Sequence, residues 1–178
     1  MRFLFIILIV ILHFTSCQKF DKKTQFDLVI EDSFIIPSII GISIPFINFL
    51  TPPVNTNIDE QLKIEEKKKK KIESIVLEEL ELSITSPALS TFSFVNDANV
   101  YISADGLPEI YIANIHNIPF TVGNRILLTT DNSLELEEYI KKDVIDLRVE
   151  ITTDETILQD INVAVKATFF VDVKVLGI

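Results

Sequence analysis

The last part of the chain alternates apolar and polar residues with a period of two. The apolar members of this series are Ile161, Val163, Val165, Ala167, Phe169, Val171, Val173 and Val175. Successive side chains of a β-strand point to opposite faces, so this spacing predicts one long or bent strand with one buried face. In a helix, residues spaced two apart would be spread around the axis and could not form one apolar face. The series therefore constrains the fold strongly.

Shorter segments repeat the same signal. Leu80, Leu82 and Ile84 alternate with polar residues, and Asp105-Gly106-Leu107-Pro108 forms a turn signal. Further strands are expected at residues 26–30, 109–115, 125–130 and 147–151. Strands and helices do not alternate as a parallel sheet requires. The pattern predicts an all-β protein, an antiparallel β-sandwich with one or two short helices.

Residues 33–54 carry no charged side chain. Five Pro or Gly residues interrupt them, so they do not suit a membrane-spanning helix. The apolar residues Phe34, Ile36, Ile40, Ile42, Ile44 and Phe46 mark one face at period two, while Ile35, Ile39 and Ile47 make the other face apolar. One or two core strands is the favoured interpretation. An exposed apolar strip for a partner or lipid is the alternative.

Two segments have helical features. In residues 55–74, Thr56 or Asn57 could cap a helix with a thin apolar stripe through Ile58, Leu62, Lys69, Ile72 and Val76. The five lysines of residues 67–71 lie beside glutamates, which indicates a solvated segment more than a binding site for acidic polymers. A second short helix is expected from Asn132 or Ser133 through Lys142.

The first seventeen residues have the organisation of an export signal. Arg2 precedes ten apolar residues, from Phe3 to Leu12, which are too few to span a bilayer. Phe14-Thr15-Ser16-Cys17 then resembles a lipobox, although Leu would be usual at position 14. The only cysteine of the chain lies where lipidation requires a thiol. Residues 1–16 are therefore expected to be a signal peptide, and Cys17 the lipid-bearing first residue of the mature protein.

The expected domains are a signal peptide (1–16), a lipidated tether (17–25) and a β-sandwich domain (26–178). Two or more acyl chains would hold the protein stably on a membrane. Gln18, Lys19 and Asp21 partly resemble a surface-export signal of Bacteroidota lipoproteins, so the outer membrane is expected and surface exposure stays open. Cleavage removes Arg2 and takes the net charge from −10 to −11, which disfavours nucleic acid as a partner.

Several turn and strand motifs resemble uncharacterised Bacteroidota lipoproteins. They are Thr51-Pro52-Pro53 with Thr56-Asn57, Leu82 to Pro87, Tyr101 to Glu109, and Thr152 to Glu155. The resemblance covers roughly residues 26–175. It implies a β-rich domain, a cell-envelope location and a lipid anchor, and it adds no catalytic residues.

Few residues could carry catalysis. His116 is the only histidine after the signal segment, and a surface loop is its favoured place, so a nucleophilic triad and the usual zinc sites are not supported. Two carboxylate pairs lie in turn regions: Asp105 with Glu109, and Asp154 with Glu155. A glycosidase needs such a pair across a cleft. Calcium is a weaker possibility, because the ligand spacing of an EF-hand loop is missing. Tyr101 and Tyr111 could line a sugar-binding face.

The sequence therefore favours a non-enzymatic binding or structural domain of the cell envelope, without cofactor or metal. The alternative is a carboxylate-dependent hydrolase acting on glycans. The protein would be attached to the membrane through the lipid on Cys17. No motif identifies a protein or glycan partner.

Overall fold

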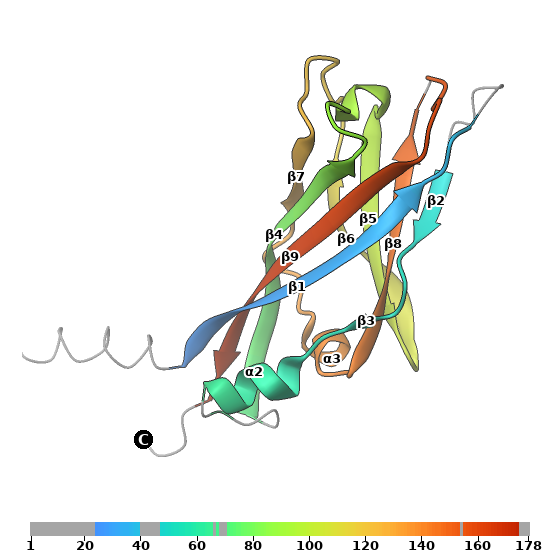
Figure 1. The fold of residues 1–178 in the computed structure, drawn as a ribbon. Helices are drawn as coiled ribbons and strands as arrows, with labels where there is room; N and C mark the ends of the chain where they lie inside the picture. The colour runs from blue at the N-terminus through green and yellow to red at the C-terminus, as the bar shows by residue number, and fades with distance from the viewer. Residues whose placement is uncertain (1–23, 40–46, 66, 68–70, 154, 175–178) are drawn as a thin grey trace, which may run out of the picture.

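The computed structural model describes residues 24–39, 47–65, 67, 71–153 and 155–174, which form strands and a few short helices (Figure 1). The signal segment, Cys17 and most of the tether lie outside these residues. The elements are β1 (Gln25–Ile36), β2 (Ile47–Leu50), β3 (Val54–Asn55), α2 (Ile58–Ile64), β4 (Ile72–Ser86), the 3₁₀ turn η2 (Phe92–Phe94), β5 (Asp97–Ala104), β6 (Leu107–Ile115), β7 (Arg125–Thr130), α3 (Glu137–Ile140), β8 (Val144–Thr152) and β9 (Ile161–Val173).

The strands form one curled antiparallel sheet in the order β1-β9-β4-β7-β6-β5-β8-β2, and β3 also pairs with β8. Strand β7 turns the corner. Its residues 125–128 pair with β4, whereas Thr129 and Thr130 pair with β6. The strands β1, β9 and β4 thus cross in front of β5, β6 and β8 as two layers (Figure 1). This arrangement confirms the predicted all-β, sandwich-like fold.

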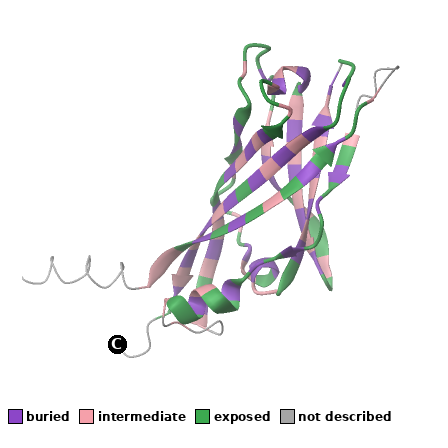
Figure 2. Cartoon of the chain, viewed as in Figure 1, coloured by how far each residue is buried: buried purple, intermediate pink, exposed green. Residues whose placement is uncertain are grey.

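The core lies between the two layers and consists of the inward members of each alternating strand (Figure 2). In β9 every odd-numbered residue from Ile161 to Val173 is buried, so the period-two prediction holds along the whole strand. Val175 lies outside the described residues. At the open edges, the Phe34 ring of β1 stacks on the Phe49 ring of β2 with centroids 5.5 Å apart. This contact brings the first and last strands of the sheet order together.

The domain has two distinct ends. At the proximal end, β1 begins and β9 ends, as the hydrogen bond from the Val173 N–H to the Thr24 carbonyl shows. Both α-helices lie at this end (Figure 1). At the distal end, Ile36 pairs with Ile161 and Ser86 with Asn162. Three connections of described residues, 87–91, 116–124 and 155–160, lie there and are called the distal loops.

The helices are shorter than predicted. Asn57 is the N-cap residue of α2, yet no side-chain hydrogen bond caps it, and the helix ends at Ile64. Ile72 and Val76, which fitted a helical stripe, belong to β4, where β9 supplies their backbone partners. Helix α3 has only four residues and begins after Leu136 rather than after Asn132 or Ser133. Lysines 68–70 lie outside the described residues.

The uncharged segment mostly supports the core-strand interpretation. Phe34 and Ile36 are buried in β1, and Phe49 is buried in β2. Ile35 and Leu50 point outward and are exposed, so the opposite face is partly open to solvent. Residues 40–46 lie outside the described residues. Within the described part of the chain, no helix is both long enough and apolar enough to cross a membrane.

Candidate functional site

The outer surface of β2, β8, β5 and β6 carries a connected group of polar and aromatic side chains. It is called the Arg148 face and consists of Asn48, Asn99, Tyr101, Glu109, Tyr111, Arg148 and Glu150. Strand alternation turns these residues outward while their neighbours fill the core. The strand register then sets Tyr101 opposite Arg148 on one side and opposite Tyr111 on the other.

Arg148 is the centre of this face. Its Nε and Nη2 groups each donate a hydrogen bond of 2.8 Å to Glu109, one to each carboxylate oxygen. Its Nη1 group donates a hydrogen bond of 2.6 Å to the Oδ1 atom of Asn48. The guanidinium carbon lies 3.9 Å from the centroid of the Tyr101 ring. A planar guanidinium suits both a two-pronged carboxylate contact and an aromatic stack, so four strands are joined by this one side chain.

The ion pair between Arg148 and Glu109 shifts the pKa of both groups. The hydrogen bonds from Arg148 lower the pKa of the Glu109 carboxyl below its ordinary value. The same bonds, with a smaller contribution from Tyr101, raise the pKa of Arg148 further above its ordinary value. Both groups therefore stay charged at neutral pH. The general acid of a glycosidase must donate a proton. A carboxylate that is held ionised donates protons poorly, so Glu109 does not suit that role.

The aromatic residues continue the face toward β7. The rings of Tyr101 and Tyr111 meet edge to face with centroids 5.6 Å apart, and the Asn114 side chain donates a hydrogen bond to the Tyr111 hydroxyl. A hollow of about 330 Å³ lies beside Tyr111 and is also lined by Thr129, Thr130 and Asp131. Aromatic faces beside hydroxyl, amide and carboxylate groups can bind a peptide or a sugar.

The structure brings some of the sequence-predicted site residues together and keeps others apart. Tyr101 and Tyr111 come together, as a common binding face requires. Glu109 pairs with Arg148, whereas Asp105 is exposed at the turn between β5 and β6. Arg148 and Asn48 were not predicted as site residues. A strand was predicted at residues 147–151, but the partners of Arg148 within it depend on the strand register.

His116 lies just after β6 and is exposed, as predicted. Its Nδ1 atom is 3.1 Å from an Asp97 carboxylate oxygen. The same oxygen accepts a hydrogen bond from the Asn117 N–H, which is the largest cause that lowers the pKa of Asp97. The other Asp97 oxygen accepts a hydrogen bond from Thr152. These contacts tie the end of β6 to β5 and β8 at the distal end.

The second carboxylate pair cannot be placed as a pair, because Asp154 lies outside the described residues. Glu155 is exposed, and its backbone N–H donates a hydrogen bond of 3.1 Å to the Thr153 hydroxyl. Cys17, the predicted lipidation site, also lies outside the described residues.

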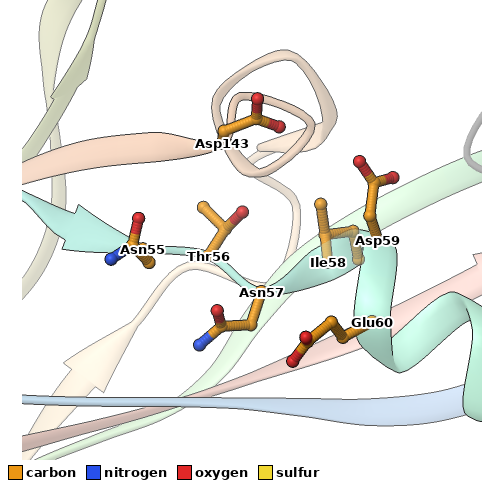
Figure 3. Close-up of a pocket in the computed structure, with 7 residues that line it drawn as sticks. All are labelled: Asn55, Thr56, Asn57, Ile58, Asp59, Glu60 and Asp143. Atoms are coloured by element: carbon orange, nitrogen blue, oxygen red, sulfur yellow. The ribbon is translucent and has the colours of Figure 1, made fainter.

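A smaller hollow lies at the proximal end, where β3 runs into α2 (Figure 3). Its volume is about 240 Å³, and its lining includes Asp59, Glu60 and Asp143. Thr56 also lines it, and its hydroxyl donates a hydrogen bond of 2.7 Å to the Lys142 carbonyl. Across the described residues, no three His, Cys, Asp or Glu side chains form a group that could hold a metal ion.

Comparisons with known proteins add no family. No protein-family model matches the chain, and no curated protein matches it. Among solved structures, the decameric BFDV capsid protein is 10% identical, with 85% of this chain and 98% of that chain covered and a TM-score of 0.41. The FLHE structure is 8% identical over 83% of this chain and 98% of that chain, with a TM-score of 0.26. Dimeric latent PorU from Porphyromonas gingivalis is 13% identical over 84% of this chain and 13% of that chain, with a TM-score of 0.29. Likenesses this distant carry no argument about function.

Proposed function

We propose that this protein is a membrane lipoprotein of the cell envelope whose sandwich-like domain binds a partner rather than catalysing a reaction. The position of Cys17 is the observation that supports a lipid anchor. This only cysteine of the chain ends an apolar export-like segment and stands eight residues before the first residue of β1. Eight residues span at most about 27 Å, so the domain would be held close to the membrane.

The direction of the tether adds a consequence. Because β1 begins at the proximal end, the tether joins the domain beside α2 and the end of β9 (Figure 1). The distal loops would then point away from the anchoring membrane. An outer-membrane location follows from the resemblance of residues 14–17 and 18–21 to Bacteroidota signals, and it remains part of the proposal.

The binding role is supported by the Arg148 face. Arg148 and Glu109 neutralise each other, Glu150 leaves the face with one net negative charge, and the lowered pKa of Glu109 suits recognition better than proton transfer. Tyr111 and the hollow beside it offer an aromatic contact next to Thr129, Thr130 and Asp131. A protein or a glycan is the class of partner that this chemistry suits.

Fractionation of cells tests the anchor. Cys17→Ala should remain unprocessed or leave the membrane fraction, because no thiol is present to receive the lipid. The matched control Ser16→Ala keeps a small residue before Cys17 and should be processed normally. If the Cys17→Ala protein still fractionated with membranes at the size of the wild type, the lipoprotein proposal would fail.

Protease treatment of intact cells tests the orientation. Loss of the domain from intact cells would place it on the outer surface, and glycans, host proteins and neighbouring transporters would then be screened as ligands. Loss only after the outer membrane is opened would place it in the periplasm, where crosslinking would identify envelope partners. Insensitivity in both conditions, with a folded control protein cleaved, would contradict an envelope location.

A further inference from the structure

The three most exposed large apolar side chains of the described residues all lie at the distal end. Leu89 is 100% exposed, Leu158 is 78% exposed and Phe120 is 74% exposed. Each belongs to a different distal loop, and the loops lie at the end of the domain opposite to the start of β1 (Figures 1 and 2). These three residues are called the apolar tip.

The backbone holds the tip residues outward. Leu89 lies in a turn closed by the hydrogen bond from the Ser90 N–H to the Pro87 carbonyl, and its φ of 69° is one that Leu rarely adopts. Phe120 lies in a turn closed by the Val122 N–H and the Pro119 carbonyl. Leu158 follows Ile157, which is buried and bridged to Ile39. Leu89 and Phe120 thus lie in hydrogen-bonded turns, and Leu158 lies next to a bridged residue.

Two of the three loops that form the tip are poor in charge. The chain has a net charge of −10, yet residues 86–96 and 117–124 contain no Asp, Glu, Lys or Arg, whereas the loop of Leu158 contains Glu155 and Asp160. A hollow of about 440 Å³ between the first two loops is lined only by uncharged residues, among them Pro87, Leu89 and Gly123. Leu89 and Phe120 could enter an apolar medium without any charge of their own loops being buried.

We propose that the apolar tip inserts into the interfacial layer of a lipid bilayer, and that this bilayer is not the one that holds the anchor. The second part rests on the proposed function. Strand β9 has 13 residues, so the domain is about 40 Å long along the strand. If the tip pointed into the anchoring bilayer, Gln25 would stand about 40 Å above it, beyond the reach of an eight-residue tether of about 27 Å.

The separation of the three side chains favours lipid over a protein partner. A stable protein interface needs about 800 Å² of contiguous, complementary surface on each partner. The apolar tip instead offers single side chains on separate loops, and Leu89 is fully surrounded by solvent. A bilayer is fluid and accepts each side chain independently. The acidic net charge further favours a zwitterionic surface over an anionic one.

A two-vesicle assay tests this inference with the full lipoprotein. The protein is reconstituted into immobilised phosphatidylcholine vesicles, and the capture of dye-filled phosphatidylcholine vesicles without protein is measured. The wild type should capture them, and Leu89→Ser, Phe120→Ser and Leu158→Ser should each lower capture about tenfold. Ile64→Ser is the matched control. Ile64 is 72% exposed at the proximal end, and its replacement should leave capture unchanged.

An optical measurement reports insertion directly. The chain contains no Trp, so Phe120→Trp introduces a single probe, whose emission should shift to shorter wavelength when vesicles are added. Ile64→Trp should show no shift. Addition of anionic phosphatidylglycerol to the captured vesicles should reduce capture at low salt.

The outcomes separate the two proposals. Failure of the protein to incorporate into the first vesicles would count against the anchor at Cys17 alone, and the Phe120→Trp shift would then test the tip in the unanchored chain. Successful incorporation without capture would overturn the membrane-binding tip, and so would full capture by a variant that combines Leu89→Ser, Phe120→Ser and Leu158→Ser. An unshifted Phe120→Trp spectrum would overturn it as well.

Discussion

Replacement of Asp32 by Val should stabilise the protein. Asp32 belongs to the inward-facing series of β1, whose neighbours Ile30 and Phe34 are buried in the core. Its Oδ2 atom is buried, and among the described residues it is the one buried side-chain polar atom without a hydrogen-bond partner. A carboxylate oxygen in such a position has lost water without gaining a donor.

The size of the expected stability change follows from the missing hydrogen bond at the Asp32 Oδ2 atom. An unsatisfied buried polar group costs about 1–3 kcal/mol, and the partial exposure of the Asp32 side chain argues for the lower part of this range. Val also has a favourable preference for strands. We therefore expect Asp32→Val to raise the free energy of unfolding by about 1–2 kcal/mol.

Urea unfolding followed by far-ultraviolet circular dichroism measures the change. With a slope of about 2 kcal/mol per molar urea, the midpoint should rise by about 0.5–1 M. Asp27→Val is the matched control, because Asp27 is exposed on the outward face of the same strand and its replacement should change stability by less than about 0.5 kcal/mol. A midpoint that stays constant or falls for Asp32→Val, with the control neutral, would refute the assigned environment of Asp32.

Three further predictions follow from the same structure. Phe169→Ala should lower the free energy of unfolding by about 3–5 kcal/mol in urea titrations, since Phe169 is fully buried in β9; a loss below about 1 kcal/mol would contradict its place in the core. Leu89→Gly should raise stability by about 1 kcal/mol in thermal unfolding, since glycine accepts the positive φ and no packing is lost; a lower melting temperature would argue against this backbone conformation. The pKa of Asp97 is lower in the folded state, so its ionised form stabilises the fold above its ordinary pKa, and this contribution disappears as the pH falls through the folded value. Asp97→Asn should therefore flatten the decline of the urea midpoint below about pH 4, and an unchanged decline would exclude Asp97 as its source.

The strands were largely predictable because burial of one sheet face imposes alternation. The series from Ile161 to Val173 and the shorter series at Leu80, Leu82 and Ile84 appear as buried faces of β9 and β4. The start of β4 was not predictable. Ile72 and Val76 are spaced as well for a helix as for a strand, and only the ladder with β9 decides between them. Likewise, β1 continues to Ile36 because β9 is long enough to pair with all of it.

The candidate site was only partly accessible from the sequence. Tyr101 and Tyr111 were predicted from the sequence to line one possible sugar-binding face, and the pairing of β5 with β6 is what brings their rings together. Arg148 and Glu109 are 39 residues apart, and their contact requires β8 and β6 to flank β5 in one particular register. The apolar tip depends on the topology in the same way, because Leu89, Phe120 and Leu158 share one end of the domain only when three connections fold to that end of the sheet. Local periodicity carries no information about such meetings.

Mass spectrometry of the N-terminal peptide from membrane-purified protein tests the central claim most directly. The lipoprotein account predicts a mature chain that begins at Cys17, with residues 1–16 absent and the added mass of a diacylglyceryl thioether and an amide-linked acyl group. A chain that retains Met1, or that is cut elsewhere and carries a free Cys17 thiol, would contradict it.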